Sequence, residues 1–306
     1  MTQVIGIDAG GTKTVGLLAD EQGRVLAEAR GGGANLQTAG ELEVEKVLDG
    51  ILEALDPTRR TVSAVCLGIA GVDRPADEQV IRGILRRLGY RETARVVNDA
   101  AIALAAGAAD RVGIVVLAGT GSIAYGADRS GRSARSGGYG FLLADEGSAY
   151  WFGHQALRLV VRAADGRGPE TLLRPLLLQA LDVETVQDLV PRVYEHGLPK
   201  HRIAALAGSV QRASDQGDPL AAELIERGAI ELALAARAVA RQLDFAGEAY
   251  PVVVAGGAFK ACPGMMEPLE RALDLPGGLL TALKTEPATG AVALALDLVR
   301  TGGPSA

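Results

Sequence analysis

The feature that most constrains the fold is a glycine–threonine turn between two short apolar strands, which occurs twice. The first turn, Ala-Gly-Gly-Thr at 9–12, follows an expected strand at 4–8, and a return strand follows it. The second, Ala-Gly-Thr-Gly at 118–121, follows an expected strand at 113–117 and is also followed by a return strand. Two hairpins of one kind, far apart in the chain, predict an internal repeat of architecture.

The repeat predicts two lobes, as is typical of a chain of 306 residues. We expect residues 1–112 to form an N-terminal lobe, completed by a C-terminal helix at 287–306, and residues 113–286 to form a C-terminal lobe. After the second hairpin we expect one clear strand, at 251–255. Helices are expected at 147–165, 170–181, 185–195, 200–215 and 219–245. Strands interleaved with helices predict an α/β fold, with a cleft between the lobes.

Composition excludes several classes of protein. A hydrophobic content of 48% supports a large core, which excludes a disordered chain. A net charge of −6 and only 4% aromatic residues argue against a nucleic-acid partner, which needs a basic face or stacking rings. No apolar run approaches the roughly 20 residues that span a bilayer, and no basic n-region precedes the first strand. We therefore expect a cytoplasmic protein with no membrane partner.

The first turn has the residues of a phosphate site. Gly10 and Gly11 lack a Cβ, so backbone N–H groups there can approach an anion closely. Thr12 and Thr14 add hydroxyl donors, and Asp8 at the strand end is suited to hold Mg²⁺, directly or through water. The alternative is a plain hairpin turn that uses glycine for its positive φ.

The second turn, with Gly119, Thr120 and Gly121, repeats this chemistry at the head of the second half. The pair therefore favours a clamp that grips a triphosphate from both sides over two unrelated hairpin turns. A third glycine pair, Gly256 and Gly257, follows the apolar strand at 251–255. That pair is equally consistent with close approach to a nucleoside and with tight packing of a helix on a strand.

These elements, in this order, resemble the sugar kinase/Hsp70/actin superfamily and, within it, the N-acetylglucosamine kinase group of the BadF-type ATPase family. The most specific stretch is Gly-Gly-Tyr-Gly-Phe-Leu-Leu-Ala-Asp-Glu-Gly-Ser-Ala-Tyr-Trp at 137–151, above all its second half, and Gln-Gly-Asp-Pro at 216–219 is similar too. The resemblance covers essentially the whole chain. It implies two actin-like, ribonuclease H-like lobes around a central cleft, and a homodimer.

The resemblance also implies a reaction: ATP- and Mg²⁺-dependent phosphorylation of an amino sugar, most simply N-acetylglucosamine to its 6-phosphate. The implied ATP-binding residues are Gly10, Gly11, Thr12, Thr14, Gly119, Thr120, Gly121, Ser214, Gly256 and Gly257, with Ser214 near the adenine. The implied sugar-binding residues are Asn35, Asp99, Gly138, Tyr139 and Asp145, with Asp99 as the catalytic base. Tyr139 stands where the animal enzymes have Trp, and Ala70 where Ser is expected, so glucosamine or another hexosamine is an alternative substrate.

The residues themselves leave second readings open. Asp99 follows Asn98 where a strand runs into a helix, and on spacing alone an N-cap is favoured over a base, although Asn98 could be the cap instead. Asn35 could simply occupy a left-handed turn, and Tyr139 could pack locally. Asp145 could merely complement a helix dipole. The preceding stretch 141–144 is, however, too apolar for an exposed loop, so we expect it to form an apolar floor beside a sugar-binding carboxylate.

A reading of another class is the activator ATPase of a 2-hydroxyacyl-CoA dehydratase-type enzyme, as in other BadF-type proteins. Those activators share an iron–sulfur cluster between subunits, with two cysteine ligands from each chain. Here Cys66 lies within an expected hydrophobic strand and Cys262 follows the third glycine pair. Neither is expected at a dimer surface, so the simpler prediction is two reduced thiols.

Overall fold

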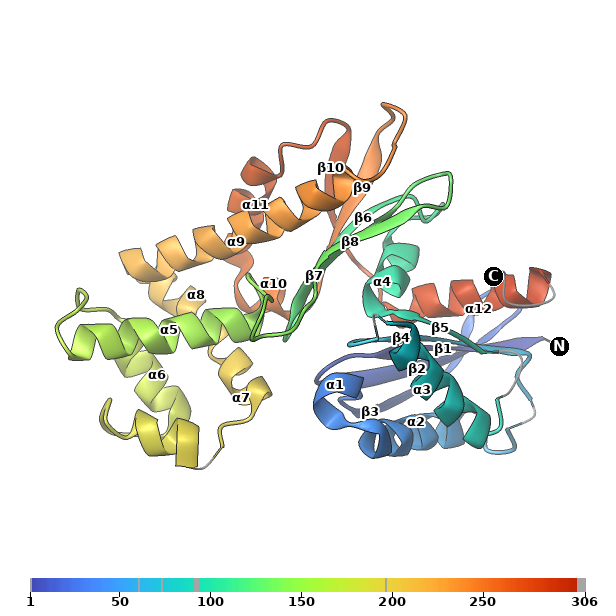
Figure 1. Cartoon of the computed structure of the whole chain (residues 1–306), viewed down its shortest axis with the longest axis horizontal. Helices are drawn as coiled ribbons and strands as arrows, with labels where there is room; N and C mark the ends of the chain where they lie inside the picture. Colours follow the sequence, from blue (N-terminus) through green and yellow to red (C-terminus); the bar gives the residue numbers. More distant parts are fainter. Residues whose placement is uncertain (1, 60, 73, 91–93, 196, 302–306) are drawn as a thin grey trace.

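The computed structural model describes residues 2–59, 61–72, 74–90, 94–195 and 197–301, and it contains two five-stranded sheets (Figure 1). The first sheet has the order β3-β2-β1-β4-β5. Its strands are β1 (Gln3–Ala9), β2 (Lys13–Asp20), β3 (Val25–Gly32), β4 (Ala64–Ile69) and β5 (Ala94–Asn98). The hairpin pairs β1–β2 and β2–β3 are antiparallel, whereas β1–β4 and β4–β5 are parallel.

The second sheet repeats the first. Its order is β8-β7-β6-β9-β10, with two antiparallel pairs on one side of β6 and two parallel pairs on the other. Its strands are β6 (Gly113–Ala118), β7 (Ser122–Ala127), β8 (Ser133–Gly137), β9 (Tyr250–Ala255) and β10 (Gly278–Ala282). The predicted α/β fold with a repeated architecture and two lobes is therefore confirmed. Sequence patterning missed β8 and β10, because these edge strands are only half covered and lack a buried apolar run.

Helices cover both faces of the first sheet. On one face lie α1 (Leu36–Ala39), α2 (Glu41–Leu55) and α3 (Pro75–Arg87). Apolar residues of α2 and α3 are buried there against β1 and β4. On the other face lie α4 (Asp99–Gly107) and α12 (Ala288–Thr301). The same α4 also packs on β6 and β9, so it stands between the two sheets (Figure 1).

The expected C-terminal helix returns to the first sheet. Helix α12 lies against β1 and β4, and residues 302–306 of the expected 287–306 helix fall outside the described ranges. Close packing here depends on Gly6 of β1: a Cβ on this residue would lie 2.3 Å from the backbone nitrogen of Val292 and 2.6 Å from the carbonyl oxygen of Ala288. This packing supports our proposal that α12 belongs to the N-terminal lobe and that the lobes divide between residues 112 and 113.

The second lobe carries a large helical part. Its helices are α5 (Ala149–Ala164), α6 (Leu173–Leu181), α7 (Lys200–Ala205), α8 (Ala207–Asp215), α9 (Pro219–Ala240), α10 (Gly257–Ala261) and α11 (Met266–Leu273). The helix expected at 185–195 forms only in its second half: residues 189–190 are helical and lead into a π-helical turn at Pro191–Glu195, whereas 185–188 form bends and turns. The helix expected at 200–215 is interrupted at Leu206. Within the described ranges, no helix has both the length and the apolar character that crossing a bilayer requires.

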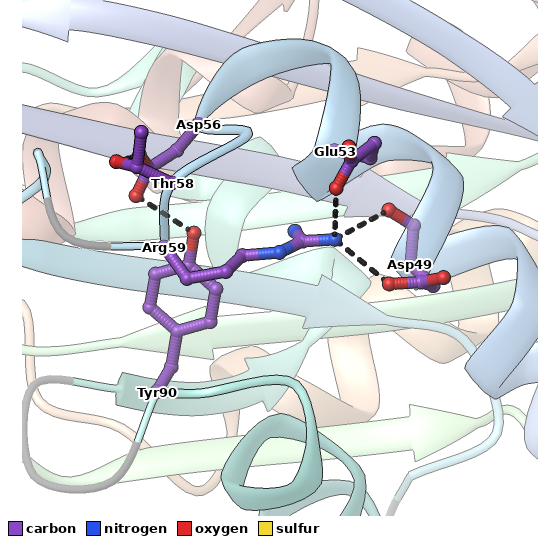
Figure 2. Close-up of polar contacts among 6 residues, drawn as sticks. All are labelled: Asp49, Glu53, Asp56, Thr58, Arg59 and Tyr90. Carbon is purple, nitrogen blue, oxygen red and sulfur yellow. Dashed lines mark hydrogen bonds and ion pairs between the residues drawn. The ribbon is translucent and has the colours of Figure 1, made fainter.

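A buried carboxylate ties the loop after α2 to the end of α3. The Asp56 side chain is fully buried and accepts hydrogen bonds from the hydroxyls of Thr58 at 3.1 Å and Tyr90 at 3.0 Å (Figure 2). It also accepts a hydrogen bond from the hydroxyl of Thr61 at 2.6 Å. Burial alone would raise the pKa of Asp56, but the donors, led by Thr61 and Tyr90, outweigh it and hold the pKa below its ordinary value.

Arg59, next to this cluster, extends the same anchor to the body of α2. Its backbone is left-handed, with φ of 56°, which points the side chain back along the helix. One guanidinium nitrogen, Nη2, then donates to Asp49 Oδ1 at 2.7 Å and to Glu53 Oε2 at 3.2 Å (Figure 2). Polar contacts therefore hold the start of the loop between α2 and β4, while Val62 near its end packs on the apolar core.

The contact between β1 and α12 gives a first prediction. Gly6→Ala would drive a methyl group into the backbone of α12, so it should lower the free energy of unfolding by about 1–3 kcal/mol in urea denaturation. Gly50→Ala is the matched control, since Gly50 lies within α2 with open space around it. That variant should gain about 0.5–1 kcal/mol from helix propensity. Equal stability of the two variants would contradict the close packing.

The Asp56 cluster gives a second prediction. Asp56→Asn should cost about 1–3 kcal/mol at neutral pH, because the donors lose a charged acceptor. A folded-state pKa below the unfolded value of about 3.9 means that this stabilisation is complete above that pH and is lost as the pH falls further. The gap between variant and wild type should therefore narrow in acid when unfolding is followed against pH. Glu231→Gln, exposed on α9, is the control, and a gap independent of pH would refute the assignment.

Candidate functional site

The strand directions bring the predicted residues of the first lobe to one edge. Strands β1, β3, β4 and β5 run the same way, so their carboxyl ends meet at one edge of the sheet. Asp8 lies near the end of β1, Asn35 follows β3, and Asp99 directly follows β5. Ligands of open α/β sheets bind outside the carboxyl ends of the strands. The edge with these three polar residues is therefore the candidate site of this lobe.

The same edge of the second sheet carries the second set. The turn with Gly119 follows β6, Gly138 follows β8, and Gly256 follows β9. These three strands also run in one direction. The repeat of topology therefore places the second turn, the start of the 137–151 segment and the third glycine pair side by side.

The two glycine–threonine turns meet. The hydroxyl oxygens of Thr12 and Thr120 lie 2.7 Å apart and share a hydrogen bond. Each turn is closed by its own backbone: Gly10 N donates to Lys13 O at 3.0 Å, and Gly119 N donates to Gly121 O at 2.8 Å. The prediction that the two turns face each other therefore holds for these two hydroxyls, which lie 108 positions apart in the sequence.

Other residues of the phosphate prediction shape these turns. The buried hydroxyl of Thr14 donates to Gly32 O at 2.7 Å, so its proton is used within the sheet. Gly256 has φ of 112°, and a Cβ there would lie 2.2 Å from the carbonyl oxygen of Ala118. A backbone approach this close requires glycine, and it sets the third glycine pair directly against the second turn. Gly257 has open space around its Cα.

Asp8 has the environment of a metal-binding carboxylate. Burial raises its pKa to about 6; Lys13 lowers it and Glu286 raises it. Lys13 is itself paired with Glu286 at 3.2 Å. Among the described residues, no hydrogen bond to the Asp8 carboxylate contributes to this shift, which burial dominates. No three His, Cys, Asp or Glu side chains gather as a metal cage in the described ranges. One carboxylate with phosphates and waters is the usual protein contribution to a Mg²⁺ site, so Asp8 fits that ion.

Asn98 and Asp99 share the start of α4. The Asn98 side chain accepts from Ala100 N at 2.8 Å and is the N-cap, while Asp99 is the first helical residue and accepts from the same N–H at 3.0 Å. Asn98 therefore takes the capping role that spacing alone favoured for Asp99. Asp99 is half-buried and lies at the carboxyl end of β5, at the edge of the sheet that carries the candidate site.

Asp145 lies against the second turn. Its side chain is 4% exposed, and a Cβ on Gly121 would lie 2.8 Å from its Oδ2 atom. Burial raises the pKa of this carboxyl, and Lys200, whose Nζ lies 3.5 Å from Oδ2, lowers it. The backbone of Asp145 has φ of 68°, an uncommon conformation for a residue other than glycine. Lys200 begins α7, in a stretch without any motif, so sequence reasoning missed it.

The expectation of an apolar floor beside Asp145 is wrong. Leu142 and Leu143 are 83% and 81% exposed, and Tyr139 is 63% exposed. The segment turns back on itself, with Ala144 N donating to Gly140 O at 2.8 Å, so the leucines lie on the outside of the turn. The ring of Tyr139 has the Arg135 guanidinium 5.0 Å from its centroid.

Two further predicted residues lie outside these direct contacts. Asn35 is the N-cap of α1, with Oδ1 accepting from Gln37 N at 3.0 Å and Thr38 N at 3.2 Å. Ser214 lies near the end of α8 and lines an open pocket of about 270 Å³. Its other lining residues come from α9 and from the segment around α11: Ala222, Ile225, Glu226, Gly264, Glu267, Pro268 and Arg271. The structure therefore shows direct contacts between the two turns and between the second turn and Asp145. Asn35 and Ser214 are not among the predicted residues that it brings into direct contact.

Known proteins resemble the chain over most of its length. It is 37% identical over 301 residues to the N-acetylmuramic acid/N-acetylglucosamine kinase of Clostridium acetobutylicum, covering 96% of this chain and 98% of that protein. It is 31% identical over 313 residues to the N-acetyl-D-glucosamine kinase of Dictyostelium discoideum, covering 96% and 97%. A solved structure of a candidate N-acetylglucosamine kinase from Chromobacterium violaceum is 27% identical, covers 96% of this chain and 99% of that one, and superimposes with a TM-score of 0.80.

The family itself follows from a broader comparison. The model of the BadF/BadG/BcrA/BcrD ATPase family matches residues 5–295, which includes both sheets and every turn described above. The expected actin-like fold agrees with the solved structure from Chromobacterium violaceum over nearly its whole length. The chain belongs to the BadF/BadG/BcrA/BcrD ATPase family.

Proposed function

We propose that the protein is an ATP-dependent kinase that converts N-acetylglucosamine to N-acetylglucosamine 6-phosphate. The observation that carries this proposal is the contact between Thr12 and Thr120, which brings two phosphate-type turns from separate sheets to one point. The names of the two curated relatives support the sugar. A homodimer stays a prediction from the family resemblance, and a cytoplasmic location stays a prediction from the sequence.

The turns would hold ATP from both sides. The open space at Gly11 and Gly119, where a Cβ would meet nothing within 4 Å, leaves room for phosphate oxygens beside the backbone of each turn. The Thr12 and Thr120 hydroxyls would turn from each other to the phosphates. Gly257 would lie beside the nucleoside, and Ser214 would line the adenine. Such a clamp supplies the positioning that phosphoryl transfer chiefly requires.

Asp8 would hold Mg²⁺, directly or through water. The ion, when bound with ATP, neutralises the charge that develops on the transferred phosphoryl group. A pKa of about 6 means that the Asp8 carboxylate is mostly ionised at neutral pH and loses its charge in mild acid. Metal binding by this residue should therefore weaken as the pH falls below that value.

The sugar would lie between the edges of the two sheets. The Asp99 carboxylate would accept the proton of the sugar 6-hydroxyl while the hydroxyl oxygen bonds to the γ-phosphorus of ATP. The bond from that phosphorus to the β–γ bridging oxygen would break at the same time, and ADP would leave. Asp145 would accept hydrogen bonds from other sugar hydroxyls. The amide of Asn35, the backbone at Gly138 and the ring of Tyr139 would complete the sugar site.

The cysteines do not support the alternative function as the activator ATPase of a 2-hydroxyacyl-CoA dehydratase-type enzyme. Cys66 and Cys262 are fully buried, and burial raises the pKa of each thiol to about 12. The Cys262 thiol also donates to Ala207 O at 3.1 Å. Cluster ligands are thiolates, often near a surface when two subunits share them, so buried protonated thiols are unsuited to that role.

A third prediction tests the proposed reaction. Purified protein with ATP and Mg²⁺ should release ADP when N-acetylglucosamine is added, and mass spectrometry should find one phosphate on the sugar. Glucosamine, N-acetylmuramic acid and glucose complete the panel, and chelation of Mg²⁺ should stop the reaction. N-acetylmuramic acid is included because the Clostridium relative has it in its name. ADP release independent of every sugar would refute the kinase.

A fourth prediction concerns the base. Asp99→Asn should lower kcat by about 10²- to 10⁴-fold, since the amide cannot accept the hydroxyl proton, while ATP binding measured by calorimetry stays unchanged. Asp182→Asn is the matched control. Asp182 is exposed and left-handed, with φ of 56°, a conformation that asparagine also tolerates. Near-normal kcat in Asp99→Asn would rule out this residue as the base.

A further inference from the structure

Lys200 is a cation that reaches the candidate site from outside the two sheets. It begins α7, a short helix of the helical part that lies between β8 and β9 in the chain. Its Nζ atom is 3.5 Å from Asp145 Oδ2, and its side chain is 26% exposed. Many ion pairs among the described residues, such as that of Arg129 with Glu248, join exposed side chains, whereas this pair includes an acid that is 4% exposed.

Two aromatic rings hold the ammonium group in place. The Lys200 nitrogen lies 4.8 Å from the centroid of the Phe141 ring and 5.6 Å from that of Tyr150. These rings touch edge to face at 5.0 Å, and Tyr150 also stacks on His154 at 5.9 Å. Cation–π attraction at such distances favours one position of the ammonium. Lys200 therefore connects the 137–147 segment, through Asp145 and Phe141, with α5, through Tyr150.

Asp145 depends on such a partner. Its carboxylate is removed from water against Gly121, which penalises the charged form. Glu146, the next residue, adds an unfavourable negative charge, whereas Lys200 and the backbone N–H of Ser122 favour ionisation. Lys200 is the one cation among these influences, and it comes from an element far away in the sequence.

We propose that Lys200 is a positioning residue that keeps Asp145 ionised and oriented as the acceptor for sugar hydroxyls. The proposal rests on the proposed function, because Asp145 matters in this way only if it binds the sugar. Lys200 acts through Asp145, without transferring a proton or a phosphoryl group itself. Its loss should therefore raise the KM for the sugar and leave the KM for ATP unchanged.

The test compares Lys200→Met with Lys200→Arg over a range of pH. In Lys200→Met the Asp145 carboxyl loses its cation, so the acid-side fall of kcat/KM for the sugar should move up by about one pH unit or more. Lys200→Arg restores the charge and should keep the fall near its wild-type pH. Lys46→Met, an exposed lysine on α2, is the control for removal of a surface charge. Wild-type acid behaviour in Lys200→Met would overturn the proposal.

A double-mutant cycle separates action through Asp145 from a general structural role. Asp145→Asn keeps the size of the side chain and tolerates the left-handed backbone. In that background Lys200→Met should cause no further rise in the sugar KM, whereas an additive rise would contradict the proposal.

Titration of the Asp145 carboxyl by carbon-13 NMR, without sugar, gives a readout independent of catalysis. The titration should move to higher pH in Lys200→Met, and an unchanged titration would refute the role of Lys200. If wild-type protein phosphorylated no sugar while this titration still moved, the proposed function would fail and the control of Asp145 ionisation would stand.

Discussion

The hydrogen bond between the Thr12 and Thr120 hydroxyls depends on both sheets at once. Each turn begins where a central strand ends, and each central strand is held on both sides, by an antiparallel hairpin and by a parallel neighbour. The α4 helix packs between the sheets and keeps them together. A shift of either sheet would separate the turns, so the candidate site is a property of the junction between the lobes.

Glycine permits this geometry at the points of closest approach. Gly6 lets α12 reach the backbone of β1, and Gly256 lets its strand end touch the start of the second turn. Gly121 leaves room for the Asp145 carboxylate. A methyl group on Gly6 or Gly256 would overlap backbone atoms, which cannot move without moving an element of the fold, and one on Gly121 would displace the Asp145 carboxylate.

Sequence patterning predicted some parts of the molecule better than others. The hairpins at Gly10 and Gly119 were predictable because turn residues and apolar strands are local signals. The edge strand β8 and the π-helical turn at Pro191–Glu195 were not, because their stability comes from neighbours along the sheet and from tertiary packing. The exposure of Leu142 was not predictable either, because an apolar residue is expected to be buried, whereas the turn closed at Gly140 directs this side chain outwards.

The amino-acid sequence by itself determined the repeated hairpins and the residue types of both turns, and it predicted which carboxylates a kinase would use. The tertiary structure alone decided which of these groups meet. Contact between Thr12 and Thr120, burial of Asp145 and its pairing with Lys200 each join residues from distant segments. Local sequence patterns do not indicate how far apart such segments lie, because sheet register and helix packing set that distance. For the same reason, the ionisation of Asp8 and Asp145 could be assessed only in the folded chain.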